Sequence, residues 1–295
     1  MNEVISGSGK QELIRWIVSL AAFFLLVMTL MRVGAWLAFG RDAIPLTQAG
    51  AAFGLGFRFD ARVVAGAMLP LLVLGGVWRF DAFRAAFGRR LWLILLGAFS
   101  ACLLFFYVGD FLHYRYLNQR LNASVLGFLA DAKISAGMVW QSYPVLRIVL
   151  GLIVALLGFM AVFRFLHRRA AAAPVPARKA VRVAWFTGTV LVCLVTIFGR
   201  LGQYPLRWSD AFSLRNDALA NLALNPVQSF LSTLDFRASG YDREKVTEFY
   251  PIMSRYLGVT VPDPDQLSFV RDVPGRGDAL AVTPNVILVI CESFS

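Results

Sequence analysis

Residues 13–39 read LIRWIVSLAAFFLLVMTLMRVGAWLAF, an apolar run that carries two charges, Arg15 and Arg32. About 20 helical residues, each rising about 1.5 Å, are enough to cross the hydrocarbon core of a bilayer. The run is much longer than the apolar part of a secretory signal peptide, and no small-residue cleavage site follows it. We therefore expect an uncleaved membrane helix that begins after a short tail, residues 1–12.

The rest of the chain has the same character. Apolar residues make up 58% of its 295 residues and charged residues only 16%, with a mean hydropathy of +0.64. Four more apolar runs follow the first, at 63–78, 91–108, 145–165 and 183–201. The run at 63–78 contains Pro70, which a membrane helix tolerates as a kink. We expect an α-helical polytopic membrane protein with a five-helix transmembrane domain over residues 13–201.

The net charge of +11 does not indicate a nucleic-acid partner, because the basic residues are scattered at the ends of apolar runs. Their placement fits membrane topology instead. Twelve of them fall on one predicted side: Lys10, Arg15, Arg79, Arg84, Arg89, Arg90, Arg164, Arg168, Arg169, Arg178, Lys179 and Arg182. Six fall on the other: Arg41, Arg58, Arg62, Arg115, Arg120 and Lys133. The richer side is expected to be cytoplasmic, which places the N-terminus inside and the chain after residue 201 outside.

Between the apolar runs and after them the amino-acid composition changes. Residues 167–179, rich in Ala, Pro and charge, are typical of a flexible cytoplasmic linker. Residues 202–283 are expected to form an extracytoplasmic helical connector. One of its helices starts at Asn225, and another runs from Asp242 to Gly258, where Pro251 is a possible break. Residues 259–284 are turn-rich.

The last residues, 285–291, read NVILVIC, a β-branched apolar run typical of a strand that is covered on both faces. Glu292 and Ser293 would lie just past its carboxyl end, where functional groups of open α/β sheets collect. We expect residues 284–295 to be the start of a truncated α/β domain. A loosely packed apolar terminus is the alternative.

Four stretches resemble the lipoteichoic-acid-synthase-like phosphoglycerol transferases, a branch of the alkaline phosphatase and sulfatase superfamily. The stretches are GFRFDARVVAGAMLPLLVL from Gly56, GDFLHYRYLNQRLN from Gly109, ALNPVQSF from Ala223, and PNVILVICESFS from Pro284. The resemblance implies five membrane helices, a helical connector and a sulfatase-like catalytic domain. It also implies a multi-pass protein of the bacterial cytoplasmic (inner) membrane.

The resemblance further implies a two-step phosphoryl transfer. A Thr at a divalent-metal site (manganese or magnesium, with zinc possible) attacks phosphatidylglycerol, and an extracytoplasmic glycan or glycolipid acceptor then takes the phosphoglycerol. Glu292 corresponds to a ligand of that metal. The nucleophile and the remaining ligands would lie beyond Ser295, so no catalytic residue is expected within this chain, which alone would be inactive.

Seven arginines are predicted near the outer membrane boundary. Snorkelling, or pairing with Asp42, Asp60, Asp110 or Asp210, explains each one separately. As a set they are a candidate site for an anionic phospholipid head group, because a guanidinium pairs bidentately with phosphate. The seven are Arg32, Arg58, Arg62, Arg115, Arg147, Arg200 and Arg207.

Two alternatives stay open. A phosphoethanolamine transferase of the same superfamily also has five spans, but its corresponding strand usually ends in G-E-T instead of E-S-F. A non-enzymatic membrane scaffold or transporter subunit is disfavoured because no predicted span carries a central acidic residue or a paired charge.

Overall fold

The computed structural model describes residues 2–40, 44–129, 131–174, 178–200, 202–237 and 242–273. They belong to two compact units, Met1–Asp235 and Phe236–Ser295, each of which is described by itself. Regular structure in the described residues is helical, and their one strand-like pairing is an isolated bridge between Asp263 and Ser268. The predicted strand at 285–291 and Glu292 lie outside the described residues.

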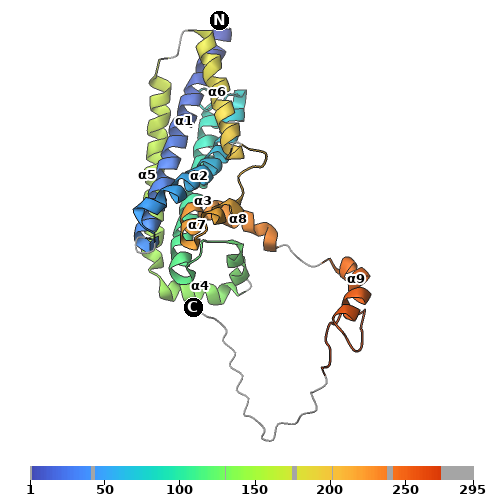
Figure 1. Cartoon of the computed structure of the whole chain (residues 1–295). Helices are drawn as coiled ribbons and strands as arrows, with labels where there is room; N and C mark the ends of the chain where they lie inside the picture. Colours follow the sequence, from blue (N-terminus) through green and yellow to red (C-terminus); the bar gives the residue numbers. More distant parts are fainter. Residues whose placement is uncertain are drawn as a thin grey trace. The chain divides into compact units, whose positions relative to one another are not determined.

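Five long helices form the body of the first unit (Figure 1). The first, α1, continues into a short π-helix, η1. The five are α1 (Asn2–Ala35) with η1 (Trp36–Gly40), α2 (Leu46–Leu74), α3 (Ala86–Leu117), α5 (Val145–Ala172) and α6 (Lys179–Phe198).

Four helices are long and apolar enough to cross a membrane: Lys10–Gly40, Ala86–Leu117, Val145–Ala172 and Lys179–Phe198. They contain three of the five predicted runs and most of a fourth, 183–201, so a helical membrane protein is confirmed. The fifth run, 63–78, is not among them. It belongs to α2, which ends at Leu74 and carries Arg58, Asp60 and Arg62 in its middle. Length and composition therefore support four crossings in the described residues, and not the predicted five.

Although it is less apolar, α2 runs antiparallel to α1 along much of that helix. Gly56 of α2 lies against Arg32 of α1, and Gly75, just past the end of α2, lies against Leu13. Helices α1 and α5 are also antiparallel, since Trp16 near the start of α1 packs edge-on against His167 near the end of α5. The N-terminal half of α1 is thus enclosed by its neighbours.

Aromatic rings and small residues pack the helices together. Phe23 and Phe24 of α1 contact Phe159 and Phe163 of α5, with ring centroids 4.9 to 5.7 Å apart. Edge-to-face rings add packing energy beyond the area they bury. Such packing matters in lipid, where apolar side chains gain little from contacting one another instead of acyl chains.

The predicted linker at 167–179 is shorter than expected. Helix α5 continues to Ala172 and α6 begins at Lys179. Arg15 Nη1 on α1 donates to the carbonyl of Ala173 at 2.8 Å, which ties this end of the connection to the bundle. A composition rich in Ala favours helix, and that preference extends α5 here.

Shorter elements complete the first unit. They are η2 (Trp78–Phe80), η3 (Ala123–Leu129), α4 (Ala132–Ser142), η4 (Trp208–Leu214), α7 (Asp217–Ala223) and α8 (Pro226–Arg237). Helices α7 and α8 lie beside the long helices (Figure 1).

The second unit contains α9 (Arg243–Tyr256), which confirms the helix predicted from Asp242 to Gly258. The Asp242 side chain accepts from Lys245 N, and Gly258 ends the helix with a φ of 68°. Pro251 does not break it. The preceding residue, Tyr250, is buried, and its hydroxyl donates to Ser268 O and accepts from Asp263 N, which fixes the helix against the following loop.

Candidate functional site at the α7–α8 junction

Arg32 of α1 forms a buried ion pair with Asp60 of α2. Its Nη2 donates to both carboxylate oxygens at 2.7 Å, and the two side chains are 3% and 0% exposed. One guanidinium nitrogen is thus shared between the two oxygens, and hydrogen bonds between charged groups are among the stronger polar contacts in proteins. An unpaired charge at this depth would cost several kcal/mol, so each residue requires the other.

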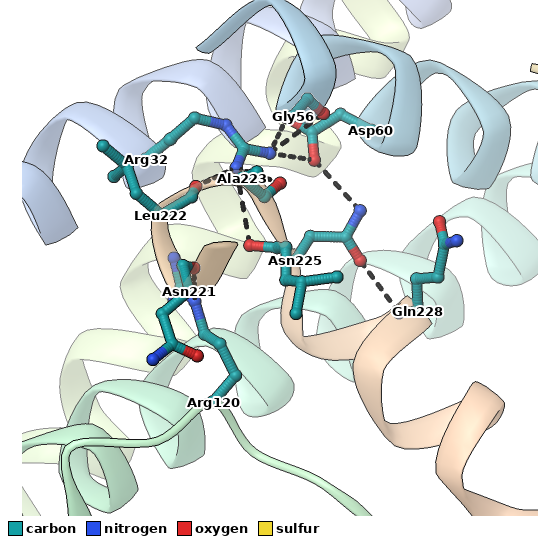
Figure 2. Close-up of polar contacts among 10 residues, drawn as sticks. Arg32, Gly56, Asp60, Arg120, Asn221, Leu222, Ala223, Asn225 and Gln228 are labelled. Atoms are coloured by element: carbon teal, nitrogen blue, oxygen red, sulfur yellow. Dashed lines mark hydrogen bonds and ion pairs between the residues drawn. The ribbon is translucent and has the colours of Figure 1, made fainter. Parts of the chain in front are cut away.

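The other terminal nitrogen of the Arg32 guanidinium binds the C-terminal end of α7. Arg32 Nη1 donates to the carbonyls of Leu222, Ala223 (2.6 Å) and Leu224 (3.4 Å), as Figure 2 shows. Carbonyls at a helix C-terminus lack partners within the helix, and a cation there is favourable. Arg32 therefore attaches α7 to α1 and α2 at once.

Gly56 makes room for this arrangement. Its carbonyl accepts from Arg32 Nη2 at 3.0 Å. A Cβ atom at this position would lie 2.3 Å from Arg32 Cζ, closer than real contacts allow. The guanidinium can lie flat on α2 only because residue 56 has no side chain.

Asn225 links the ion pair to the start of α8. Its Nδ2 donates to Asp60 Oδ1 at 3.0 Å, while its Oδ1 accepts from Gln228 N at 2.8 Å. The second bond is an N-cap, which confirms the predicted start of the helix. The apolar side of α8 is less buried than its polar side: Gln228 and Ser229 are buried and Leu231 is 57% exposed.

A second buried pair holds the same short helix from α3. Arg120 donates through Nη1 to Asp110 Oδ2 and through Nε to Asn221 O, the latter at 2.6 Å. Asp110 Oδ1 also accepts from Leu121 N at 2.9 Å, which positions the chain after α3. The arginines of the two ion pairs thus donate to neighbouring backbone carbonyls at the C-terminal end of α7. We call this set the arginine clamp: Arg32, Asp60, Asp110, Arg120 and Asn225, with the carbonyls of residues 221–224.

The clamp is built to position the chain and has no room for a lipid. Its two arginines, Arg32 and Arg120, already donate hydrogen bonds to carboxylates and backbone carbonyls. The cavity beside it has a volume of about 20 Å³, which is room for about one water molecule. Trp36, Tyr114 and Arg120 are among the residues that line it. A phospholipid head group does not fit there.

Comparisons with known proteins return no matching family model, no similar curated protein and no similar solved structure. The geometry of the described residues assigns the clamp a mechanical role, because buried and mutually paired charges are unavailable for proton transfer or for binding an ion without first being separated.

The structure separates the seven predicted head-group arginines by their contacts. Arg32 is in the clamp, Arg62 donates to Leu206 O, and Arg200 pairs with Asp210 at 3.5 Å. These pairings of Arg32 and Arg200 confirm the simpler prediction of ion pairs with Asp60 and Asp210. Asp110 pairs with Arg120 instead, and Asp42 lies outside the described residues. The other four arginines, Arg58, Arg115, Arg147 and Arg207, are exposed. The Cζ atom of Arg207 lies 5.4 Å from the centroid of the Tyr204 ring.

No predicted span carries a central acidic residue, and none of the four helices in the described residues that are long and apolar enough to cross a membrane has one at its centre. Asp60 lies outside the predicted run 63–78, at the middle of α2, which begins at Leu46. The pairing of Asp60 with Arg32 and Asn225 shows a packing role for this charge. Arg120 and Asn225, which complete the clamp, were not predicted to contact these acids.

The described residues do not fit a divalent metal. They contain no cluster of three or more His, Cys, Asp or Glu side chains that could hold an ion. Glu292, the predicted ligand, lies outside them, and one carboxylate supplies too few donors for the coordination that such ions require. No chemical step can be derived through a metal from this part of the chain.

Proposed function

We propose that this chain is the membrane-anchored part of a sulfatase-like phosphoglycerol transferase. The intact enzyme would move phosphoglycerol from phosphatidylglycerol to an extracytoplasmic glycan or glycolipid. In this proposal the described residues hold the chain in position and take no part in the chemical reaction. The long helices lie in the bilayer, and the clamp holds α7 and the start of α8 against them.

One observation carries the proposal. The stretches that resemble the family from Gly56, Gly109 and Ala223 are far apart in the sequence, and each supplies members of the clamp. The first gives Asp60, with Gly56 against Arg32, and the third gives Asn225 with the Ala223 carbonyl (Figure 2). The second gives Asp110 and Arg120. A chance likeness of separate stretches gives no reason for them to meet at one buried site. Their meeting supports a shared architecture.

We include α2 as a fifth crossing. From Gly56, beside Arg32, to Gly75, beside Leu13, it follows α1 for roughly 30 Å at about 1.5 Å per residue. The charge of Asp60 is neutralised inside the bundle by Arg32. With the N-terminus in the cytoplasm, five crossings place α7 and α8 outside the bacterial inner membrane, where the acceptor would be.

The proposal requires the rest of a catalytic domain after Ser295, including the nucleophile and the other metal ligands. Its first test is the reading frame of the gene. A frame that ends at Ser295 would overturn the enzyme assignment and leave a membrane scaffold. A continuing frame is expected to encode a Thr nucleophile and Asp, His and Glu ligands.

The second test is turnover by the intact gene product in vesicles that contain acyl-labelled phosphatidylglycerol and a glycolipid acceptor. We expect release of labelled diacylglycerol, and we expect Glu292→Ala and Glu292→Gln to abolish it while membrane insertion stays normal. Full release by both variants would overturn the role of Glu292. Turnover of phosphatidylethanolamine instead would identify the alternative transferase.

A further inference from the structure

A basic pocket opens between α3 and α5, away from the clamp. Its volume is about 340 Å³, and it is lined by Arg89, Leu93, Arg164, His167 and Arg168. The His167 ring contacts Trp16 of α1, which precedes Arg32 by about 24 Å of helix. The pocket therefore belongs to the other end of the bundle, the end with the larger predicted share of basic residues.

Helix geometry brings the three arginines together. Helices α3 and α5 are in close contact where Gly97 faces Met160, since a Cβ on Gly97 would lie 3.2 Å from Met160 Sδ. One turn further lie Leu93 on α3 and Arg164 on α5. Another turn brings Arg89 and Arg168, because residues four apart share a helix face. The charges thus come from the first turn of α3 and the last turns of α5.

One wall of the pocket is fixed by packing. The His167 ring stacks on Phe83, with centroids 4.3 Å apart and planes inclined by 8°, and meets the Trp16 ring edge-on. Its Nε2 lies 3.0 Å from the carbonyl oxygen of Ala82. Because a carbonyl only accepts, Nε2 carries a hydrogen there. The ring orientation is set before any ligand arrives.

The arginines of the pocket lack acidic partners among the described residues. The ion pairs found there are Arg32–Asp60, Arg120–Asp110, Arg200–Asp210 and Lys245–Asp242. Three guanidiniums around one pocket repel each other. An anion would relieve this repulsion.

We propose that this pocket binds the phosphate of an anionic phospholipid head group. A soluble phosphate shares the chemistry, but two features favour a lipid. Leu93 gives the pocket an apolar side, and the most apolar stretch of α5 has no buried residue, so acyl chains can continue along it. Basic pockets between membrane helices recognise anionic head groups in this way. The inference is independent of the proposed transferase activity.

The test is lipid binding by the purified chain in neutral detergent, measured by native mass spectrometry with cardiolipin, phosphatidylglycerol or phosphatidylcholine. We expect both anionic lipids to bind more tightly than phosphatidylcholine. Arg89→Ala with Arg168→Ala should weaken that binding by about 25-fold, the product of two surface arginines at roughly five-fold each.

A matched control removes the neighbouring charges, Arg90→Ala with Arg169→Ala, from the same helices without touching the pocket. Little change is expected in this control. Equal losses in both double variants would mean diffuse attraction and would overturn the site, as would no loss in the first. Displacement of the lipid by millimolar inorganic phosphate or glycerol phosphate would identify a soluble ligand and overturn the lipid assignment.

If the alanine variant fails to fold, Arg89→Lys with Arg168→Lys serves instead. Lysine keeps the charge but loses the bidentate fork that fits phosphate. We expect a smaller loss of binding to anionic lipid, with thermal stability like the parent. Unchanged affinity in this variant would overturn recognition by the guanidinium groups.

Discussion

Gly56 of α2 lies directly against the guanidinium of Arg32 on α1, so closely that a Cβ on Gly56 would fall 2.3 Å from Arg32 Cζ. The contact joins two helices and, through Arg32, the end of α7. Because residue 56 has no side chain, the guanidinium of Arg32 can reach both Asp60 and the end of α7.

We expect Gly56→Ala to destabilise the protein, although alanine is the better helix former. The new methyl displaces Arg32 and separates it from Asp60, and breaking a buried pair costs about 3–5 kcal/mol. The measurement is thermal unfolding of the detergent-solubilised protein. Gly54→Ala is the control, because a Cβ there meets nothing within 4 Å. It should be neutral or slightly stabilising, and similar losses in both variants would contradict the steric explanation.

Arg32→Ala should destabilise more than Asp60→Asn. The first leaves Asp60 charged with one remaining donor, Asn225 Nδ2, and removes the donor to the carbonyls at the end of α7. The second keeps the shape of the site, and Arg32 retains its carbonyl acceptors. We expect about 3–5 kcal/mol against about 1–3 kcal/mol. The reverse order in chemical unfolding would show that Arg32 contributes little to holding α7.

The two kinds of ion pair in the first unit should differ in their effect. Arg120 is 6% exposed and pairs with the buried Asp110, whereas Arg200 is 47% exposed and pairs with Asp210. Arg120→Ala should cost several kcal/mol, and Arg200→Ala at most about 1 kcal/mol. Limited proteolysis gives a local readout, since loss of Arg120 should expose the chain after α3 to cleavage. Equal protease resistance in the two variants would contradict this difference.

The sequence predicted the membrane helices well because each apolar run is long and stands out from its flanks. It predicted the caps at Asn225 and Asp242 because a cap depends on its nearest neighbours in the chain. The full extent of α2 was missed. Its N-terminal half, Leu46 to Arg62, carries the acidic residue Asp60, which no local pattern places inside a bundle; the pairing with Arg32, on another helix, explains it.

The clamp could be predicted in part. Asp60 and Asp110 were named as possible partners for arginines, since an acid near a membrane helix needs one. The choice of Arg120 for Asp110, and of Asn225 for Asp60, depends on how α3, α7 and α8 pack. Asn225 and Asp60 are 165 positions apart, and Arg120 and Asp110, although only ten apart, are separated by the end of α3, so neither pairing follows from local spacing.

The last prediction is the path of the chain through the membrane. It rests on the charge asymmetry of the loops and on the antiparallel packing of α1 with α2. Reporter fusions after Arg84 and after Ala172 should behave as cytoplasmic, and a fusion after Ser209 as exported. Because fusions remove later helices, the intact chain is also tested by cysteine labelling. Ala85→Cys and Ser209→Cys, each in a background with Cys102, Cys193 and Cys291 replaced by Ala, should react from opposite sides.

This labelling also decides whether α2 crosses. If it does, Gln48 and Ala85, near the two ends of α2, lie on opposite sides of the membrane, and Gln48→Cys at this exposed position should label from outside. If α2 returns to the same side, Gln48→Cys and Ala85→Cys should label together. In that case the buried Arg32–Asp60 pair would lie near one surface instead of within the bilayer, and α7 would lie on the same side as the N-terminus. An exported reporter at Ala172 would overturn the orientation as a whole, and with it the extracytoplasmic position of residues 202–273.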